Sequence, residues 1–428
     1  MRSPREALAR GLYSLLLRLL QPAYALRLWL RGRAEPLYRE RIGERFGFYR
    51  EPRSTGWVWL HAVSLGEARA AQALVDALRV EWPAMRLLLT HGTATGFEAG
   101  RSLLREGDHQ TWLPYDTPGA TRRFIAQFRP AIGVLMETEV WPNLLLAAQA
   151  ARVSMVLANA RLSARSFARG QRINAVLRLA IDSVALVLAQ TEDDARRIRA
   201  SGARTVEVAG NLKYDLTPDA AQLAQGEAWR ALLQRGVVLA AITREGEEAL
   251  LLAAYMRVFD AQARQDTLLV LVPRHPQRFD AVAGEIERAG FRCARRSLGM
   301  THIDTVDVLL GDSMGEMAAY YSFCDIAIIG GSFLPLGGQN LIEACALGKP
   351  VIMGPSTFNF AGTVQLARDA GAMLQVADAP EAMRVAHQLM RDDARRKNMS
   401  DSGFKLIDAN RGATEKTLAL IVSVLGEN

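Results

Sequence analysis

Residues 56–71 read GWVWLHAVSLGEARAA. A continuous apolar run ends at a turn that carries Gly66 and Glu67, and alanine-rich helical sequence follows. An apolar strand that leads into a helix is the repeating unit of α/β proteins with parallel sheets. An acidic residue suits the first turn of a helix, whose amino-terminal end is positive. Because ligand-binding groups are also placed on such turns, the stretch supports both a structural and a functional interpretation of Glu67.

The same strand-to-helix unit recurs from residue 57 to the end of the chain. Most of the apolar runs are followed by sequence rich in Ala, Leu, Arg and Glu. The runs occupy residues 56–63, 86–92, 131–138, 153–160, 184–191, 236–243, 267–274, 306–312, 326–332 and 350–356. This alternation predicts an α/β architecture of the doubly wound kind, with parallel sheets covered by helices on both faces.

The alternation breaks once, at AGNLKYDLTPDAAQLAQGEAW, residues 209–229. A chain of 428 residues is long for a single core, so we interpret the break as a boundary between two Rossmann-like domains that face a central cleft. The predicted parts are a membrane-associating segment over 1–50, a first domain over 51–210, a linker over 211–235 and a second domain over 236–428.

The net charge of +7 is concentrated at one end of the chain. Residues 1–50 hold eleven arginines and four glutamates, and residues 51–428 balance at zero. A nucleic-acid-binding protein usually spreads basic side chains over a binding face. We therefore expect no nucleic-acid partner.

The basic end is also apolar, since residues 5–33 read REALARGLYSLLLRLLQPAYALRLWLRGR. Three arginines interrupt this sequence before residue 30, and no uncharged run approaches the roughly 18 residues of a spanning helix. Leucine, tyrosine and tryptophan mixed with arginine are typical of a segment that lies in a membrane interface. We expect residues 7–30 to lie on an anionic membrane surface, and Pro22 to kink or end the helix. A spanning helix and a soluble helix packed on its own domain are the alternatives.

Several kinds of site are disfavoured by the sequence. The three cysteines are scattered without a CxxC pair, which favours a reducing compartment over a disulfide framework or a zinc site. The six histidines are dispersed, so we expect no bound metal. The chain has no P-loop, no GxSxG and no GxGxxG after the first strand, which disfavours NTP hydrolysis, serine-hydrolase chemistry and a nicotinamide cofactor.

Polar sequence follows the apolar runs of the first domain, where parallel strands present their carboxyl ends. THGTATGFEAG at 90–100 is suited to a phosphate or a sugar, and METEVWPN at 136–143 carries Glu137 and Glu139. We expect these two carboxylates, at the end of a strand, to point to opposite faces. One of them would then enter the site while the other forms a structural pair.

Two loops of the second domain offer groups suited to a phosphate. VPRHPQRFD at 272–280 places Arg274 on a turn stiffened by two prolines, and a guanidinium matches phosphate geometry. GDSMGEM at 311–317 has Ser313 and Glu316 at the spacing of a capping box. A capped helix start also offers backbone N–H groups to an anion.

A third loop is rich in glycine, GGSFLPLGGQNLIEACALGKPVIMGP at 330–355. Asn340 and Glu343 again have a spacing like that of a capping box. Glycines let the backbone approach a ligand closely, and a glutamate just inside the helix can accept from ribose hydroxyls. A capped helix start explains the asparagine but not the number of glycines.

These motifs together resemble those of the bacterial 3-deoxy-D-manno-octulosonic acid (Kdo) transferases, over nearly the whole chain. The series is LLQPAYALRLWLRGRAEPLYRERIGERFGFY, HAVSLGE, THGTATGFE, METEVWPNLL, NARLSARS, GNLKYD, TREGEE, PRHPQRF, GDSMGEM, GGSFLPLGGQNLIEA and PVIMGPSTFNF. Gln339 and NLIE depart mildly from the histidine- and proline-containing versions of enterobacterial members.

The resemblance implies a glycosyltransferase-B fold, with the donor CMP-Kdo held mostly by the second domain and the lipid A precursor lipid IVA as acceptor. It implies inverting transfer with Glu67 as the general base, and we expect that carboxylate to be ionised at pH 7. CMP would be bound by Pro273, Arg274, Met314, Gly315, Glu316, Asn340, Leu341, Ile342 and Glu343. The candidates for the acceptor side are Ser64, Gly66, Thr95, Gly96, Glu137, Glu139, Arg161 and Lys213.

The resemblance also implies an enzyme of lipopolysaccharide core biosynthesis on the cytoplasmic face of the inner membrane, without a cofactor. The nearest alternative is another glycosyltransferase of this fold that uses a different nucleotide sugar. Preferential binding of a nucleotide other than CMP would distinguish it from a Kdo transferase. A catalytically silent nucleotide-sugar binder is an alternative of another class, and a product assay would separate it.

Overall fold

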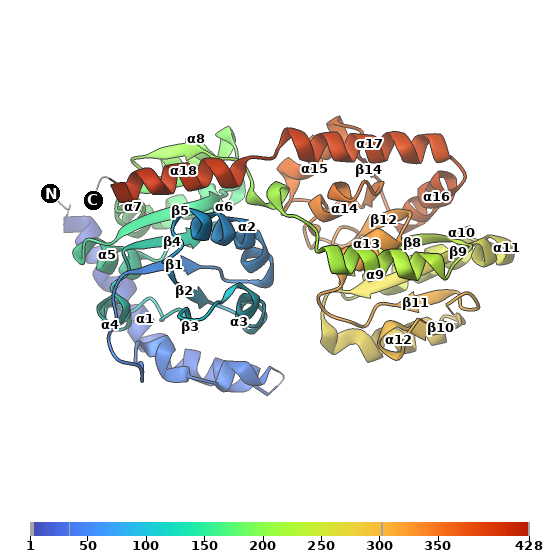
Figure 1. Ribbon diagram of the computed structural model, residues 1–428. Coiled ribbons are helices and arrows are strands. Elements are labelled where there is room, and N and C mark those ends of the chain that lie inside the picture. Colours follow the sequence, from blue (N-terminus) through green and yellow to red (C-terminus); the bar gives the residue numbers. More distant parts are fainter. Residues whose placement is uncertain (1–3, 34, 301–302, 427–428) are drawn as a thin grey trace. The chain divides into compact units, whose positions relative to one another are not determined.

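The computed structural model describes residues 4–33, 35–300 and 303–426. The chain divides into two compact units, of which unit 1 holds residues 1–216 and 411–428 and unit 2 holds residues 217–410. Each unit contains a parallel seven-stranded sheet with helices packed on it (Figure 1). The predicted fold class, two Rossmann-like α/β domains of the glycosyltransferase-B type, is confirmed.

The sheet of unit 1 has the strand order β3-β2-β1-β4-β5-β6-β7. Its strands are β1 (Trp57–His61), β2 (Arg86–His91), β3 (His109–Trp112), β4 (Ile132–Met136), β5 (Ser154–Ala160), β6 (Leu186–Ala189) and β7 (Val206–Val208). Its helices are α1 (Pro4–Arg31), α2 (Leu65–Glu81), α3 (Ala94–Gly100), α4 (Pro118–Phe128), α5 (Pro142–Ala150), α6 (Ala164–Gly170), α7 (Asn174–Asp182), α8 (Glu192–Ala200) and α18 (Ala413–Gly426), with a 3-10 turn, η5 (Leu212–Asp215).

The sheet of unit 2 has the order β10-β11-β9-β8-β12-β13-β14. Its strands are β8 (Gly236–Thr243), β9 (Thr267–Pro273), β10 (Cys293–Arg295), β11 (Val308–Leu310), β12 (Ile326–Ile329), β13 (Val351–Met353) and β14 (Met373–Gln375). Its helices are α9 (Ala220–Ala231), α10 (Glu247–Val258), α11 (Ala261–Asp266), α12 (Phe279–Arg288), α13 (Met317–Phe323), α14 (Ile342–Ala346), α15 (Ala361–Asp369), α16 (Ala379–Met390) and α17 (Asp393–Ala409).

Strand β1 shows why its sequence is a continuous apolar run. Trp57 and Trp59 lie in one apolar cluster, together with side chains of α4, α5, α7 and α8. Val58 and Leu60 lie in a second cluster, which includes side chains of α2 and α18. Because successive side chains of a strand point to opposite faces, a strand covered on both faces needs apolar side chains on both, and β1 is apolar at every position except its last, His61.

Each sheet has a point at which the strand order reverses direction, beside its first strand. In unit 1 the reversal lies between β1 and β4, where His61 is paired with Leu135. In unit 2 it lies between β8 and β12, where Ala241 is paired with Ile329. Crevices at the carboxyl ends of strands at such a reversal are the usual ligand sites of open α/β sheets.

The observed division of the chain differs from the predicted domain boundaries in two ways. The predicted linker, residues 211–235, contains η5 in unit 1 and the helix α9 in unit 2, and the boundary falls between Leu216 and Thr217. The last helix, α18, belongs to unit 1 rather than to the second domain (Figure 1). The reason is packing, because Ile421 of α18 is fully buried in the cluster that covers α2 and β1.

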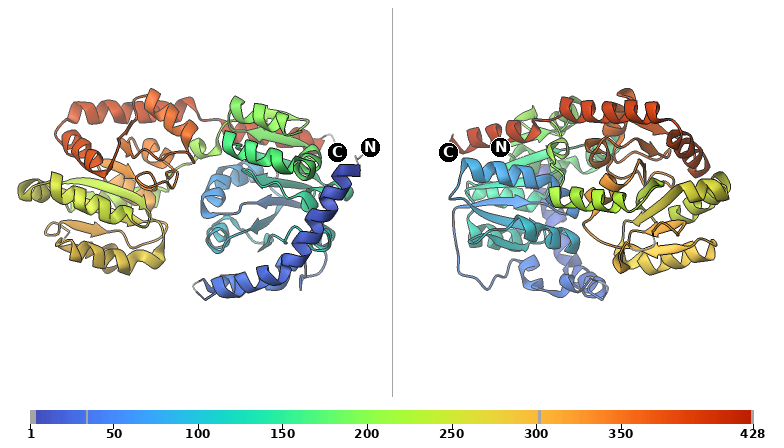
Figure 2. Two further views of the ribbon diagram at one scale, coloured as in Figure 1. Left: turned by 180° about the vertical axis from the view of Figure 1, so that it is seen from behind. Right: turned by 45° about the vertical axis from the view of Figure 1, so that its right-hand side comes forward.

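Helix α1 runs along the outside of unit 1 (Figure 2). It continues through Pro22, so of the two expected effects of this proline, a kink or an end of the helix, the end does not occur. Most of its leucines point away from the protein, although Leu28 is buried. Those that expose between 52% and 70% of their surface are Leu8, Leu12, Leu15, Leu16, Leu19 and Leu26.

The opposite side of α1 attaches the helix to unit 1 through polar and aromatic groups. Tyr13 donates a hydrogen bond of 2.9 Å to Asp116, and Ser14 donates one of 3.1 Å to the Asn143 side chain. The Tyr24 ring stacks on Tyr115. The helix therefore differs from an ordinary surface helix, because most of its leucines face outward while the Tyr13 and Ser14 hydroxyls face inward. Within the described ranges, no helix combines the length and apolar character that a membrane crossing requires.

Candidate active site

The turn between β1 and α2 holds the Glu67 carboxyl group in place. Ser64 is the N-cap of α2, and its hydroxyl donates a 3.0 Å hydrogen bond to Glu67 Oε1. The Val63 backbone N–H donates one of 2.8 Å to Oε2. This is a variant of the capping box, so the structural interpretation of Glu67 holds. Both bonds also fix the Glu67 carboxyl group at the carboxyl end of β1. The structural interpretation is therefore compatible with the functional interpretation.

Glu67 shares this position with two further acidic residues, Glu137 and Glu139. Burial, followed by the negative charge of Glu137, raises the pKa of Glu67 to about 7, against hydrogen bonds from Val63 and Ser64 that lower it. The charge of Glu139 adds to the increase. The expectation that Glu67 is fully ionised at pH 7 is therefore wrong, because tertiary neighbours outweigh the helix terminus.

The prediction that Glu137 and Glu139 point to opposite faces is also wrong. Strand β4 ends at Met136, and Glu137 has a φ of 58°, which lies in the left-handed region that non-glycine residues seldom adopt. The alternation of a strand therefore does not apply to this segment, and in a regular strand two residues that are two positions apart would share a face. Both carboxylates act on Glu67.

Each of these two carboxylates has a partner of its own. Lys213, on η5, donates a 2.7 Å hydrogen bond and ion pair to Glu137. Glu139 accepts a 2.7 Å hydrogen bond from the Trp141 indole N–H, and its Oε2 lies 4.0 Å from Nε2 of the fully buried His61. Burial lowers the pKa of His61 to about 3, so the imidazole is neutral and does not offset the Glu139 charge.

The other candidates of unit 1 differ in their burial and in their contacts near these three carboxylates. Gly96 packs against the Glu67 turn, because a Cβ at that position would lie 2.5 Å from the Val63 carbonyl oxygen. Gly66 and Thr95 are exposed. The Arg161 carbonyl accepts a 2.7 Å hydrogen bond from Thr138, the residue between the two glutamates. The structure therefore gathers the candidates of unit 1 at the carboxyl ends of β1, β2, β4 and β5.

In unit 2, cationic groups collect at the carboxyl ends of β8 and β9. Arg274 follows Pro273, the last residue of β9, and its N–H donates a 2.9 Å hydrogen bond to the Thr243 carbonyl. Burial, and then the charges of Arg244, Arg274 and Arg278, lower the pKa of His275. An anionic group is the kind of ligand that such a positive site would take.

The loop between β11 and α13 differs from its prediction. Helix α13 starts at Met317 with Glu316 as its N-cap, and Ser313 instead makes a 2.8 Å hydrogen bond with the Tyr320 hydroxyl. The predicted capping box is therefore wrong. Met314 and Gly315 are exposed, and Glu316 accepts a 2.9 Å hydrogen bond from Arg296.

Close packing and positive φ angles account for the glycines in the loop after β12. A Cβ at Gly330 would lie 2.6 Å from the Ile242 carbonyl oxygen, so the ends of β8 and β12 could not approach each other with a larger residue. Gly331, Gly337 and Gly338 all have positive φ angles, between 68° and 87°. The Asn340 side chain accepts a 3.2 Å hydrogen bond from the Ile342 N–H.

Next to the Asn340 cap, Leu341 and Ile342 are buried. Glu343 lies within the first turn of α14, where its carboxyl oxygen is 3.4 Å from the Asn340 amide nitrogen.

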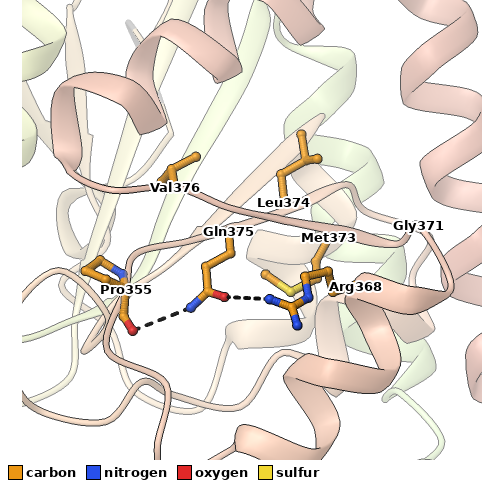
Figure 3. Close-up of a pocket in the computed structure, with 7 residues that line it drawn as sticks. All are labelled: Pro355, Arg368, Gly371, Met373, Leu374, Gln375 and Val376. Atoms are coloured by element: carbon orange, nitrogen blue, oxygen red, sulfur yellow. Dashed lines mark hydrogen bonds between the residues drawn. The ribbon is translucent and has the colours of Figure 1, made fainter.

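A separate hollow of about 500 Å³ lies beside the edge strand β14, and Figure 3 shows its lining. Gln375 lies there between Arg368 and the Pro355 carbonyl, and hydrogen-bonds to both at 3.4 Å (Figure 3). Its lining contains none of the predicted donor or acceptor residues. The predicted residues of unit 2 lie instead at or after the carboxyl ends of β9, β11 and β12.

Sequence reasoning missed three residues at the two reversal points. His61 and Asn159 are buried beside the acidic group of unit 1, where Asn159 Oδ1 accepts a 3.1 Å hydrogen bond from the Leu212 N–H. Glu247 is fully buried in unit 2. All three lie at or just after the carboxyl end of a predicted strand, which was the available signal. Among the residues that the structure describes, no three His, Cys, Asp or Glu side chains gather in a way that could hold a metal ion.

Comparison with known proteins gives one consistent family. The family described as 3-deoxy-D-manno-octulosonic-acid transferase (kdotransferase) matches residues 40–216. The 3-deoxy-D-manno-octulosonic acid transferase of Bordetella pertussis is 46% identical over 98% of this chain and 100% of that protein. The transferase of the same name from Haemophilus influenzae is 34% identical over 98% and 99%.

A solved structure supports the fold over most of the chain. The UDP-GlcNAc 2-epimerase from Neisseria meningitidis is similar with a TM-score of 0.59, at 18% identity, over 87% of this chain and 100% of that one. At this identity the likeness concerns the fold alone. The full-length match to the transferases is what identifies the family, and this chain belongs to the 3-deoxy-D-manno-octulosonic acid transferases.

Proposed function

We propose that this protein transfers Kdo from CMP-Kdo to the lipid A precursor lipid IVA, in lipopolysaccharide core biosynthesis, with inversion at the anomeric carbon and Glu67 as the general base. The observation that carries the proposal is the Glu67 carboxyl group. It is held by two hydrogen bonds at the strand-order reversal of unit 1, and burial with Glu137 raises its pKa to about 7. A carboxyl group with that pKa is about half ionised at neutral pH, and its ionised form is a stronger base than an ordinary carboxylate.

The proposed step balances as follows. The Glu67 carboxylate takes the proton of an acceptor hydroxyl, whose oxygen forms a bond to the anomeric carbon of Kdo. The bond between that carbon and the phosphate oxygen of CMP breaks, and CMP leaves with the electron pair. The leaving phosphate is already stable as an anion, so it needs positive surroundings rather than a general acid. Arg274, beside Arg244, supports this role for unit 2.

The donor would be held by groups around the reversal point of unit 2. Pro273 and Arg274 follow β9, Met314–Glu316 precede α13, and Asn340–Glu343 lead into α14. Exposed backbone at Gly315 suits close contact with a nucleotide, and the Glu343 carboxylate suits a pair of ribose hydroxyls.

The surface of α1 supports a lipid acceptor and a location on the cytoplasmic face of the inner membrane. The exposed leucines form one stripe along the helix, because residues three and four apart share a face. By helical geometry, the exposed Arg18 and Arg27 lie on opposite flanks of that stripe, where guanidinium groups would meet lipid phosphates. An interfacial helix has this arrangement.

Mass spectrometry of the lipid product tests the proposal. The purified protein is incubated with lipid IVA and a CMP-Kdo-generating system, and in parallel with UDP-N-acetylglucosamine as the sugar donor. We expect a mass increase of one or more Kdo units with the first donor only, and the spectrum also counts the additions. Transfer from the UDP-sugar, or unchanged lipid from a folded protein that binds CMP, would contradict the donor or the acceptor respectively.

A further inference from the structure

Glu247 is a fully buried carboxylate at the start of α10. Its Oε2 accepts hydrogen bonds from two backbone N–H groups, of Arg244 at 2.9 Å and of Gly331 at 2.6 Å. Its Oε1 accepts a third, from the Phe333 N–H at 2.9 Å. One oxygen atom thus joins the turn after β8 directly to the loop after β12.

Of the two segments that Glu247 joins, the end of β8 has a strained backbone, and the two segments are closely packed. Ile242 has a φ of 59°, which is an outlier for a β-branched residue, and the pairing of β8 with β9 shifts register between Ala241 and Thr243. Gly330 of the other segment presses against the Ile242 carbonyl. Strained backbone persists only where surrounding contacts fix it, and bulges of this kind are common beside active sites.

The three hydrogen bonds allow Glu247 to be buried between the turn after β8 and the loop after β12. An isolated carboxylate in a protein interior is very unfavourable, and three N–H donors are what satisfies this one. Within the glycine loop, Ser332 hydrogen-bonds to the Ile329 carbonyl and Phe333 packs on the apolar core, and Glu247 ties the loop directly to the turn after β8. Fixing its first residues through Gly331 and Phe333 therefore sets where the rest of the loop, which leads to Asn340, can lie.

We propose that Glu247 is the positioning residue of the nucleotide site in unit 2, because it holds the arginine-bearing turn after β8 and the glycine loop after β12 at the separation that a CMP group needs. The inference rests on the proposed function for the identity of the ligand. Glu247 itself need not touch the nucleotide, since it acts through the backbone of both segments.

The test uses Glu247→Gln in the full-length protein, with CMP as the probe in titration calorimetry. The amide keeps the size of the side chain but turns one acceptor into a donor that faces backbone N–H groups. Asp325→Asn is the matched control, because Asp325 accepts a 2.7 Å hydrogen bond from the Val237 N–H at the opposite end of β8. Glu247→Asp, which keeps the charge on a shorter side chain, replaces the glutamine variant if that variant does not fold.

We expect Glu247→Gln to weaken CMP binding at least tenfold and to raise the KM for the sugar donor while the KM for the lipid acceptor is unchanged. Hydrogen exchange of the Gly331 and Phe333 amides should accelerate. Asp325→Asn should keep wild-type CMP affinity even if it lowers the melting temperature. CMP affinity within twofold of wild type in Glu247→Gln, or an equal loss in Asp325→Asn, overturns the inference. Failure of the wild-type protein to bind CMP is a different result, which overturns the proposed donor and with it the ligand of this inference.

Discussion

At the scale of a single residue, Glu67 experiences two opposite influences. The helix start and the hydrogen bonds from Val63 and Ser64 favour the ionised carboxylate, whereas burial and the charges of Glu137 and Glu139 favour the protonated acid. The second group of effects is larger, since the pKa is raised from 4.5 to about 7. The folded protein therefore binds a proton at Glu67 over a pH range in which the unfolded chain has released it.

This difference predicts how stability depends on pH. Because the pKa of Glu67 is higher in the folded state, its contribution to stability is fully present below pH 4.5 and is lost as the pH rises through about 7. Glu67→Gln cannot ionise and escapes this loss. Relative to wild type, we expect the variant to gain about 1–3 kcal/mol of unfolding free energy between pH 4.5 and pH 8, measured by urea unfolding at both values.

Glu98→Gln is the control for this comparison, since Glu98 is exposed and pairs only with Arg101 at 3.1 Å. Asp116, whose pKa burial raises to about 6, titrates in the same range but in all three proteins, so it cancels. If the difference in unfolding free energy between Glu67→Gln and wild type did not change with pH, the pKa of Glu67 would not be raised in the folded state.

The position of Glu67 could be predicted from sequence, and its proton affinity could not. The rule that parallel strands present ligand sites at their carboxyl ends depends on local patterns, which the stretch at 56–71 contains. The raised pKa depends on burial and on the nearby charges of Glu137 and Glu139, which arise only when the strands pack. Glu137 shows the difference plainly, because nothing in the local sequence indicates that its backbone is left-handed.

At the scale of elements, α1 differs from a typical surface helix in the leucines that it exposes. Its leucine stripe is exposed, and its contacts with unit 1 include hydrogen bonds from Tyr13 and Ser14. We expect Leu15→Gln combined with Leu19→Gln to reduce binding to vesicles that contain phosphatidylglycerol at least tenfold, since burying each leucine in the interface contributes roughly 1.5–3 kcal/mol.

Cosedimentation with vesicles measures this effect, and the melting temperature should not change because both leucines are exposed. Leu232→Gln is the control, since Leu232 exposes 57% of its surface but lies in unit 2. Equal loss of vesicle binding in the control, or undiminished binding by the α1 variant, would rule out the leucine stripe as the membrane contact.

The strands that the sequence did not predict share one position. All ten apolar runs form strands, and the four remaining strands, β3, β7, β10 and β14, are the outer strands of the two sheets. They are three or four residues long, and β7, β10 and β14 are only partly buried. An outer strand is not enclosed on all sides, so it needs no continuous apolar run, and the pattern that identifies an inner strand is missing.

At the scale of the whole molecule, the chain leaves unit 1 after Leu216 and returns to it at Arg411. The return is fixed by Asp215, whose carboxyl oxygens accept hydrogen bonds from the Gly412 and Thr414 N–H groups at 2.8 and 2.6 Å. The order of motifs could not predict this return, because a helix after the last strand reads as part of the nearest domain in sequence. Only the tertiary packing of Ile421 on the core of unit 1 assigns it.

This path predicts that a change in the last helix affects the first unit. Ile421→Ala should lower the unfolding free energy of unit 1 by about 2–4 kcal/mol, the usual effect of truncating a fully buried isoleucine. Hydrogen exchange with mass spectrometry should show faster exchange in peptides of α2 and β1 and unchanged exchange in β8 and β9. Faster exchange confined to unit 2 would contradict the assignment of α18.

The central claim is that Glu67 accepts the proton in Kdo transfer, and the rate of transfer as a function of pH tests it most directly. The account predicts that kcat/KM of the wild-type protein rises with pH and levels off above the pKa of about 7. In Glu67→Gln, with CMP binding intact, it should fall by roughly 10²–10⁴ and lose that rise. A Glu67→Gln protein that transfers Kdo at near wild-type rate, with the same dependence on pH, would contradict the account.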